Sequence, residues 1–129
     1  MLNRDDLKTT VHPVTTTDDD TARVGSAIPA NMRRFIYAIK AINEHNAANL
    51  LTLGKRENGA VATTPVDYVQ FATQYETWKD PDELKEDSAP LYIVEGAGAV
   101  GASYLRAVTS LMTAGLGAYL TIWYIDAPA

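Results

Sequence analysis

The run of residues 117–126, GAYLTIWYID, constrains the fold more than any other part of the chain. β-Branched and aromatic residues dominate it, and its side chains alternate between two faces as in a β-strand. One face holds Tyr119, Thr121, Trp123 and Ile125, and the other holds Leu120, Ile122 and Tyr124. Because both faces are largely apolar, the pattern predicts a strand buried on both sides. Such a strand requires a sheet, built by the rest of the chain, that receives it.

Length and composition narrow the class of protein. A chain of 129 residues suits one domain with its own core. The net charge of −5 disfavours a nucleic-acid partner. The chain has no cysteine, so disulfides and thiolate metal sites are excluded. His12 and His45 lie in separate polar segments, so we expect two surface residues and no metal site.

Two segments must be tested as motifs of other protein classes, one as a membrane span and one as a calcium-binding loop. Residues 107–125 form 19 uncharged positions, close to the length of a membrane span. Several threonines and glycines interrupt them and their second half alternates like a strand, so we expect no membrane partner. The acidic run 18–20 lacks the alternating spacing of a calcium loop, which predicts a solvated turn.

Residues 1–27 differ in composition from everything that follows. They contain six threonines and five aspartates, and no aromatic residue occurs before Phe35. Such a segment cannot bury enough apolar surface to fold alone, so we interpret it as an extended polar N-terminal arm. It is either a flexible tail or an arm that becomes ordered on a neighbouring subunit. Residues 28–129 would then form the folded domain.

Alternation and turn signals divide that domain into short strands. The pattern predicts strands over 33–43, 50–53 and 90–95. A further strand lies within 61–71, and Pro65 either makes it an edge strand or places its start after Pro65. Residues 33–42 and 118–125 are expected to pair as strands of one antiparallel core. Asp80 and Pro81 have the pattern of a helix start. Residues 102–116 fit either an amphipathic helix or a strand followed by a loop.

The sharpest motif is the glycine-rich run GAGAVG at residues 96–101, which follows the strand-like PLYIVE. If residues 102–116 are helical, this stretch resembles the first half of a Rossmann dinucleotide-binding unit. That resemblance implies cofactor-binding roles for Gly96, Gly98, Gly101 and Asp126. Asp126 lies 30 residues after Gly96, however, whereas the acid is expected about 20 residues on. In the other interpretation the glycines form a tight passage between strands.

The rest of the chain shows no pattern of catalytic residues. Carboxylates cluster at 80–87, where no apolar surroundings would raise their pKa values for acid catalysis. Tyr75 and Trp78, beside this acidic stretch, could form a carbohydrate-binding or adhesive edge, or could simply pack onto the sheet. We therefore expect a protein that is not an enzyme and that needs no cofactor or metal.

The order of these segments suggests an all-β, antiparallel β-sandwich. The succession IPANMRRFIYAIKAIN, LLTLG, a polar insertion, PLYIVEGAG, YLRAVTS and AYLTIWYID is similar to small jelly-roll domains of virion proteins. Decoration or cement proteins on tailed-phage heads are examples. The resemblance implies a structural protein of the capsid surface, commonly a homotrimer, whose arm reaches a neighbour in a larger shell. Under this hypothesis residues 102–110 are a strand. A dinucleotide-binding oxidoreductase component is the alternative, and a carbohydrate-binding module the third.

Overall fold

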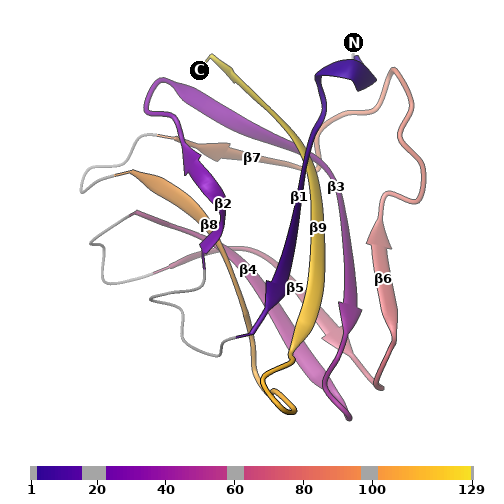
Figure 1. Ribbon diagram of the computed structural model, residues 1–129. Helices are drawn as coiled ribbons and strands as arrows, with labels where there is room; N and C mark the ends of the chain where they lie inside the picture. The colour runs from indigo at the N-terminus through magenta and orange to yellow at the C-terminus, as the bar shows by residue number, and fades with distance from the viewer. Residues whose placement is uncertain (1–2, 16–22, 58–62, 97–101, 129) are drawn as a thin grey trace.

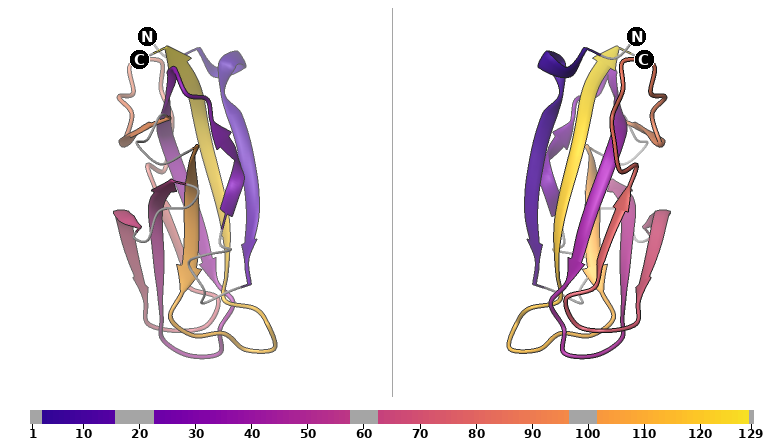
Figure 2. Two further views of the ribbon diagram at one scale, coloured as in Figure 1. Left: turned by 90° about the vertical axis from the view of Figure 1, so that its left-hand side faces the viewer. Right: turned by 90° about the vertical axis from the view of Figure 1, so that its right-hand side faces the viewer.

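The computed structural model describes residues 3–15, 23–57, 63–96 and 102–128. Two antiparallel sheets pack face to face, which confirms the predicted all-β sandwich. Figure 1 shows the strands of both layers, and Figure 2 shows sheet B in its left view and sheet A in its right view. A short 3-10 turn, η1 (Arg4–Asp6), precedes the first strand.

The strands divide between the sheets as follows. Sheet A contains, in spatial order, β1 (Lys8–Val14), β9 (Ala118–Pro128), β3 (Met32–Asn43) and β6 (Thr77–Asp80), with β7 (Tyr92–Glu95) also paired to β3. Sheet B contains β2 (Arg23–Ile28), β8 (Ser103–Thr109), β4 (Asn49–Glu57) and β5 (Thr64–Phe71). β5 is an edge strand of its sheet, which confirms the first interpretation of Pro65, and the other interpretation is wrong because β5 begins at Thr64 and includes Pro65.

The pairing of the strands is that of a jelly roll. β6 pairs with the end of β3, from Ile39 to Ile42, and β7 pairs with its beginning, from Arg33 to Ile36. These two strands therefore act as one interrupted strand. When β6 and β7 are counted as one strand, the sandwich has eight strands, and the pairs are nested. The first strand (β1) pairs with the eighth (β9), the second (β2) with the seventh (β8), the third (β3) with the sixth (β6 and β7), and the fourth (β4) with the fifth (β5). This nested order is produced when one long hairpin wraps into two sheets.

The N-terminal segment is not an arm, which corrects the predicted boundary at residue 28. β1 pairs with β9 from Lys8 to Val14, and β2 pairs with β8 in the other sheet. Val14 and Val24 are almost completely buried. Composition misled the prediction because β1 and β2 need few large apolar residues of their own. Each is an edge strand whose backbone groups pair on one side with a strand of the core, and threonine is a good strand former. The acidic run 18–20 lies outside the described residues.

The core lies between the sheets, and β9 contributes Leu120, Ile122 and Tyr124 to it. β9 and β3 are paired antiparallel from Met32 and Pro128 to Asn43 and Ala118, which confirms the predicted central pair. The expectation that β9 is buried on both faces is wrong, because sheet A has no layer on its outer side in the described chain. Tyr119 on that side is 44% exposed.

Strand pairing decides two positions where the sequence allowed a helix, residues 102–116 and the segment that begins at Asp80. Residues 103–109 form β8, which lies between β2 and β4, so the helical interpretation of this stretch is wrong. The described residues contain no helix long and apolar enough to cross a membrane. Asp80 ends β6 opposite Ile39 and begins no helix, because it is held extended in the ladder with β3.

Candidate interaction surface on sheet A

Of the seven large hydrophobic residues that are exposed in the described parts of the chain, three lie on the outer face of sheet A: Val11, Ile93 and Tyr119. Cross-strand register assigns to this face, at one end, Val11, Pro13, Ile42 and Tyr119, and at the other end Phe35, Ile93 and Ile125. We call these seven residues the outer strip. Val11 is 53% exposed, and Ile93 is 54% exposed. The right view of Figure 2 faces the strands that carry the strip.

The strip has few charges within it. Lys40 and Lys79 are paired across β3 and β6 and form one row with Val11 and Thr121. At the far end, Nε of Arg33 lies 2.8 Å from Oε1 of Glu95, although it is not aligned for a hydrogen bond. Rows of threonine and aliphatic residues separate these positions. Such a surface costs little desolvation when another protein covers it.

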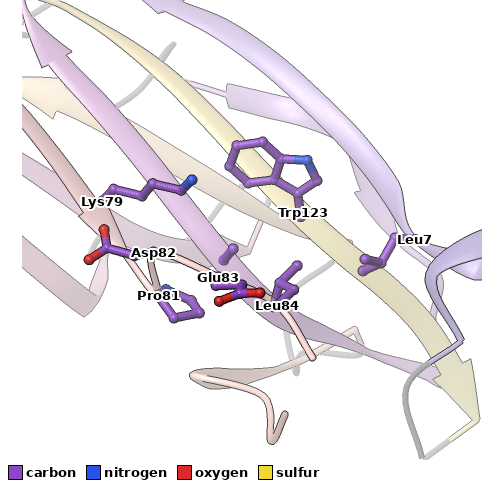
Figure 3. Close-up of a pocket in the computed structure, with 8 residues that line it drawn as sticks. Leu7, Lys79, Pro81, Asp82, Glu83, Leu84 and Trp123 are labelled. Atoms are coloured by element: carbon purple, nitrogen blue, oxygen red, sulfur yellow. The ribbon is translucent and has the colours of Figure 1, made fainter. Parts of the chain in front are cut away.

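A pocket interrupts the outer face beside Trp123. Trp123 is in register with Thr9 on one side and with Ala38 on the other. The segment 81–84, which leaves β6 after Asp80, passes over the sheet beside the indole (Figure 3). The cavity has a volume of about 350 Å³ and is lined by Leu7, Ala38, Lys79, Pro81, Asp82, Glu83, Leu84 and Trp123. Sequence analysis missed this site because it assigned the Trp123 face to a buried layer.

The outer face of sheet B has a different chemistry. Arg23 and Arg106, paired across β2 and β8, both approach the ring of Tyr104, at 4.4 Å and 6.0 Å from its centroid. Arg106 is only 2% exposed. Tyr68 on the neighbouring β5 is 56% exposed. Two arginines and two tyrosines, Tyr104 and Tyr68, therefore lie on this side of the sandwich, and the outer strip has no counterpart to their Arg–Tyr contacts.

The residues assigned to a dinucleotide site do not form one. A Cβ atom at position 96 would collide with the carbonyl oxygens of Pro29 and Met32, so Gly96 permits a close approach of backbones. The strand β8 occupies the place where a helix was required. Gly98 and Gly101 lie outside the described residues. The Rossmann-type arrangement is therefore wrong, and Gly96 has the packing role of the other interpretation.

Asp126, the proposed ribose-binding acid, belongs to a buried ion pair. Its two carboxylate oxygens accept hydrogen bonds from Nε and Nη2 of Arg34, at 2.8 and 2.9 Å. Nη1 of Arg34 donates to the carbonyl oxygen of Ser26 in sheet B, and the guanidinium stacks on Tyr124. Only 1% of the Arg34 side chain and 9% of the Asp126 side chain are exposed. This pair joins the two sheets and presents no carboxylate to a ligand.

The proposed aromatic edge of Tyr75 and Trp78 is also not formed. Trp78 lies on the inner face of β6 opposite Ala41 and packs against the core. Tyr75 is 72% exposed and lies in the preceding turn with a positive φ of 62°. The alternative prediction, that such an aromatic residue packs onto the sheet, is confirmed for Trp78.

The histidines are not both surface residues, contrary to expectation. His45 is 9% exposed, and its Nδ1 lies 2.7 Å from Oγ1 of Thr113. His12 is half-buried on the inner side of β1, where desolvation lowers its pKa below the usual 6.5. No group of three or more potential metal ligands of the histidine, cysteine or carboxylate type occurs in the described ranges.

A second polar pair, partly buried, spans the gap between β7 and β5. The hydroxyl of Tyr92 donates a short hydrogen bond to Oδ2 of Asp67. Partial burial, with the hydrogen bond to Asp67, raises the pKa of Tyr92 above its ordinary value of 10.0. The pair joins the sheets, as Arg34 and Asp126 do, and we assign it a structural role.

Comparison of the chain with family models, with curated proteins and with solved structures gave no match. Functional inference therefore depends on the surface itself. Of the features described, the outer strip combines exposed apolar side chains with positions on strands, and the pocket beside Trp123 is a cavity next to it on the same face.

Proposed function

We propose that this protein is a non-catalytic structural component that assembles with copies of itself into a larger protein shell. The outer strip of sheet A is the observation that carries this proposal. Aromatic and aliphatic side chains with few charges characterise the centre of protein interfaces. Clusters of exposed apolar side chains commonly mark such contacts, and the strip has one cluster at each end of the face.

The placement of the strip on strands favours tight association. Each of its seven residues lies on β1, β3, β7 or β9, so little conformational freedom is lost when the face is covered. A second copy offers the same apolar surface, and closed symmetry lets each copy bury its strip. A capsid surface is the shell that we favour, because the jelly-roll order is similar to that of small virion proteins. Fold alone does not carry that step.

The oligomeric state in solution tests the proposal. We expect the full chain to elute as an oligomer, with a homotrimer as the favoured state, when its mass is measured by light scattering. Val11→Asp combined with Tyr119→Asp places two charges in the strip and should shift the mass toward the monomer. Circular dichroism will establish that the variant is folded.

A matched control comes from the other sheet. Tyr68 is at least as exposed as the two substituted residues but lies on β5. Tyr68→Asp should therefore leave the mass unchanged. The proposal is contradicted if the unmodified chain is a monomer at every concentration tested, or if Tyr68→Asp dissociates the oligomer as well as the strip variant does.

A further inference from the structure

We propose that the pocket beside Trp123 binds a neutral saccharide of one or two sugar rings. This function goes beyond assembly, and none of the residues that line the pocket belongs to the outer strip. Because the pocket lies between the two ends of the strip on the same face, the Val11→Asp, Tyr119→Asp monomer is the form in which the pocket stays open to solvent. The inference begins with the small side chain of Ala38. Its position beside Trp123 in the register leaves the indole without a large neighbour on β3. A cavity therefore exists where a larger side chain would fill the sheet surface.

The walls of the pocket come from two separate parts of the chain, the segment 79–84 and Leu7, which stand on either side of Trp123. Figure 3 shows Lys79 extending from β6 toward the indole, with Leu7 on the opposite side of the ring. The segment 81–84 continues the wall that Lys79 begins. The indole is partly buried, so its position is fixed while part of its surface stays accessible. This arrangement gives a ligand one aromatic platform and polar groups along its edges.

The polar groups of the pocket are available for hydrogen bonds. Lys79, Asp82 and Glu83 are exposed. Within the described part of the chain, none of these three side chains forms an ion pair or a hydrogen bond. Lys79 can donate hydrogen bonds, and the two carboxylates can accept them. A ligand that carries both donors and acceptors is therefore favoured.

Charge and size narrow the ligand to a neutral sugar. The charged lining residues Lys79, Asp82 and Glu83 carry a net charge of −1, which disfavours an anionic ligand, and Lys79 opposes a cation that approaches it. A pyranose ring is neutral, and its hydroxyl groups both donate and accept hydrogen bonds. Its apolar C–H face can stack on the indole through dispersion and the negative face of the ring. A volume of about 350 Å³ is sufficient for a monosaccharide or a disaccharide.

Intrinsic fluorescence can test this directly, because the chain has only two tryptophans. Trp78→Phe leaves Trp123 as the sole indole reporter. We would titrate this variant with glucose, galactose, mannose, N-acetylglucosamine and the disaccharides maltose, cellobiose and lactose. We expect a saturable change in emission for at least one sugar, with a dissociation constant of about the millimolar range for so small a ligand.

Variants then locate the binding. Asp82→Asn combined with Glu83→Gln keeps the shape of the pocket and should weaken binding at least roughly tenfold, the size expected for losing charge-assisted hydrogen bonds. Tyr68→Ala removes an exposed aromatic residue of the other sheet, and should leave binding unchanged. Ala38→Val adds two methyl groups beside the indole, and should narrow the cavity and weaken binding while the emission spectrum of the free protein stays that of a folded chain.

Several outcomes would overturn the inference. These are the absence of saturation with every sugar, an equal response in the Asp82→Asn, Glu83→Gln variant, and binding of only charged probes such as choline or glucuronic acid. Failure of the assembly proposal can be told apart from failure of the sugar-binding proposal, because the Val11→Asp, Tyr119→Asp variant should be a monomer that still binds the sugar. Loss of sugar binding with retained oligomer mass would refute the pocket and leave the assembly proposal standing.

Discussion

The two faces of sheet A are built from the same strands and are both rich in apolar residues, but sheet B covers only one of them. On β9, Ile122 faces inward and is 1% exposed, whereas Tyr119 faces outward and is 44% exposed. The same contrast holds for neighbouring arginines of β3, because Arg34 is paired inside the sandwich and Arg33 outside it. Hydrophobic alternation therefore indicates which residues share a face, and it does not indicate which face the fold covers.

The difference gives the two faces different roles. Inner residues determine the stability of one copy, because their burial is complete without any partner. Outer residues of similar chemistry contribute little to that stability, and they are available for association or ligand binding. Substituting the same residue type on the inner face and on the outer face tests this difference in role.

The largest effect is expected from the buried ion pair. Arg34→Met leaves the Asp126 carboxylate buried without its partner, which should lower the free energy of unfolding by about 3–5 kcal/mol. Arg33→Met, one residue earlier on the exposed face, should change it by less than about 1 kcal/mol. Urea denaturation of both variants measures the difference.

Removing both buried charges provides the control for that comparison. Arg34→Met combined with Asp126→Leu should recover most of the lost stability, since no uncompensated charge remains. If Arg33→Met and Arg34→Met lower the free energy of unfolding equally, then exposure to solvent does not separate the two faces of sheet A.

A smaller effect is expected from the isoleucine pair of β9. Ile122→Ala should destabilise the protein by about 2–5 kcal/mol, because it leaves a cavity between the sheets. Ile125→Ala on the partly exposed outer face should cost less than about half as much. Denaturant titration of the strip-disrupted monomer separates this effect from any contribution of assembly. A near-neutral Ile122→Ala would place the core elsewhere.

The smallest effect is expected from His12, on the inner side of the edge strand β1, and it concerns how stability depends on pH. Burial lowers the pKa of His12, so below pH 6.5 the unfolded chain binds more protons than the folded one. Stability is therefore full above pH 6.5 and falls as the pH decreases through that value. His12→Gln should reduce the difference in thermal midpoint between about pH 7.5 and about pH 5. An unchanged difference would show that His12 is solvated like an outer residue.

Much of the sandwich was predictable from the sequence because strand signals are local. Residues 33–42 and 118–125 alternate strongly, and Pro65 marks an edge strand through the missing N–H group. β1 and β2 were not predictable in the same way, because their stability comes from pairing with residues about 100 and about 80 positions away. Only the topology shows that this threonine-rich part of the chain pairs with two strands of the core, β1 with β9 and β2 with β8.

The candidate site was harder to predict than the fold. Trp123 was visible in the sequence, but its exposure depends on Ala38 and on the segment 81–84, which belong to different parts of the chain. Gly96 illustrates the opposite error. Its motif suggested a phosphate site, whereas the backbones of Pro29 and Met32 leave no room there for a side chain. Contacts between distant segments decide both cases, and local spacing does not report them.

The nested pairing of the strands also sets the order in which the protein can fold. Lys8 pairs with Tyr124 and Val14 with Ala118, so sheet A cannot be completed until β9 has left the ribosome. Until then the unpaired edge of β1 is exposed to other nascent chains. Closing such long loops is slow, and domains dominated by distant pairings fold over roughly milliseconds to seconds. The threonines and Pro13 of β1, which made this strand hard to recognise, also make it a poor template for aggregation during that wait.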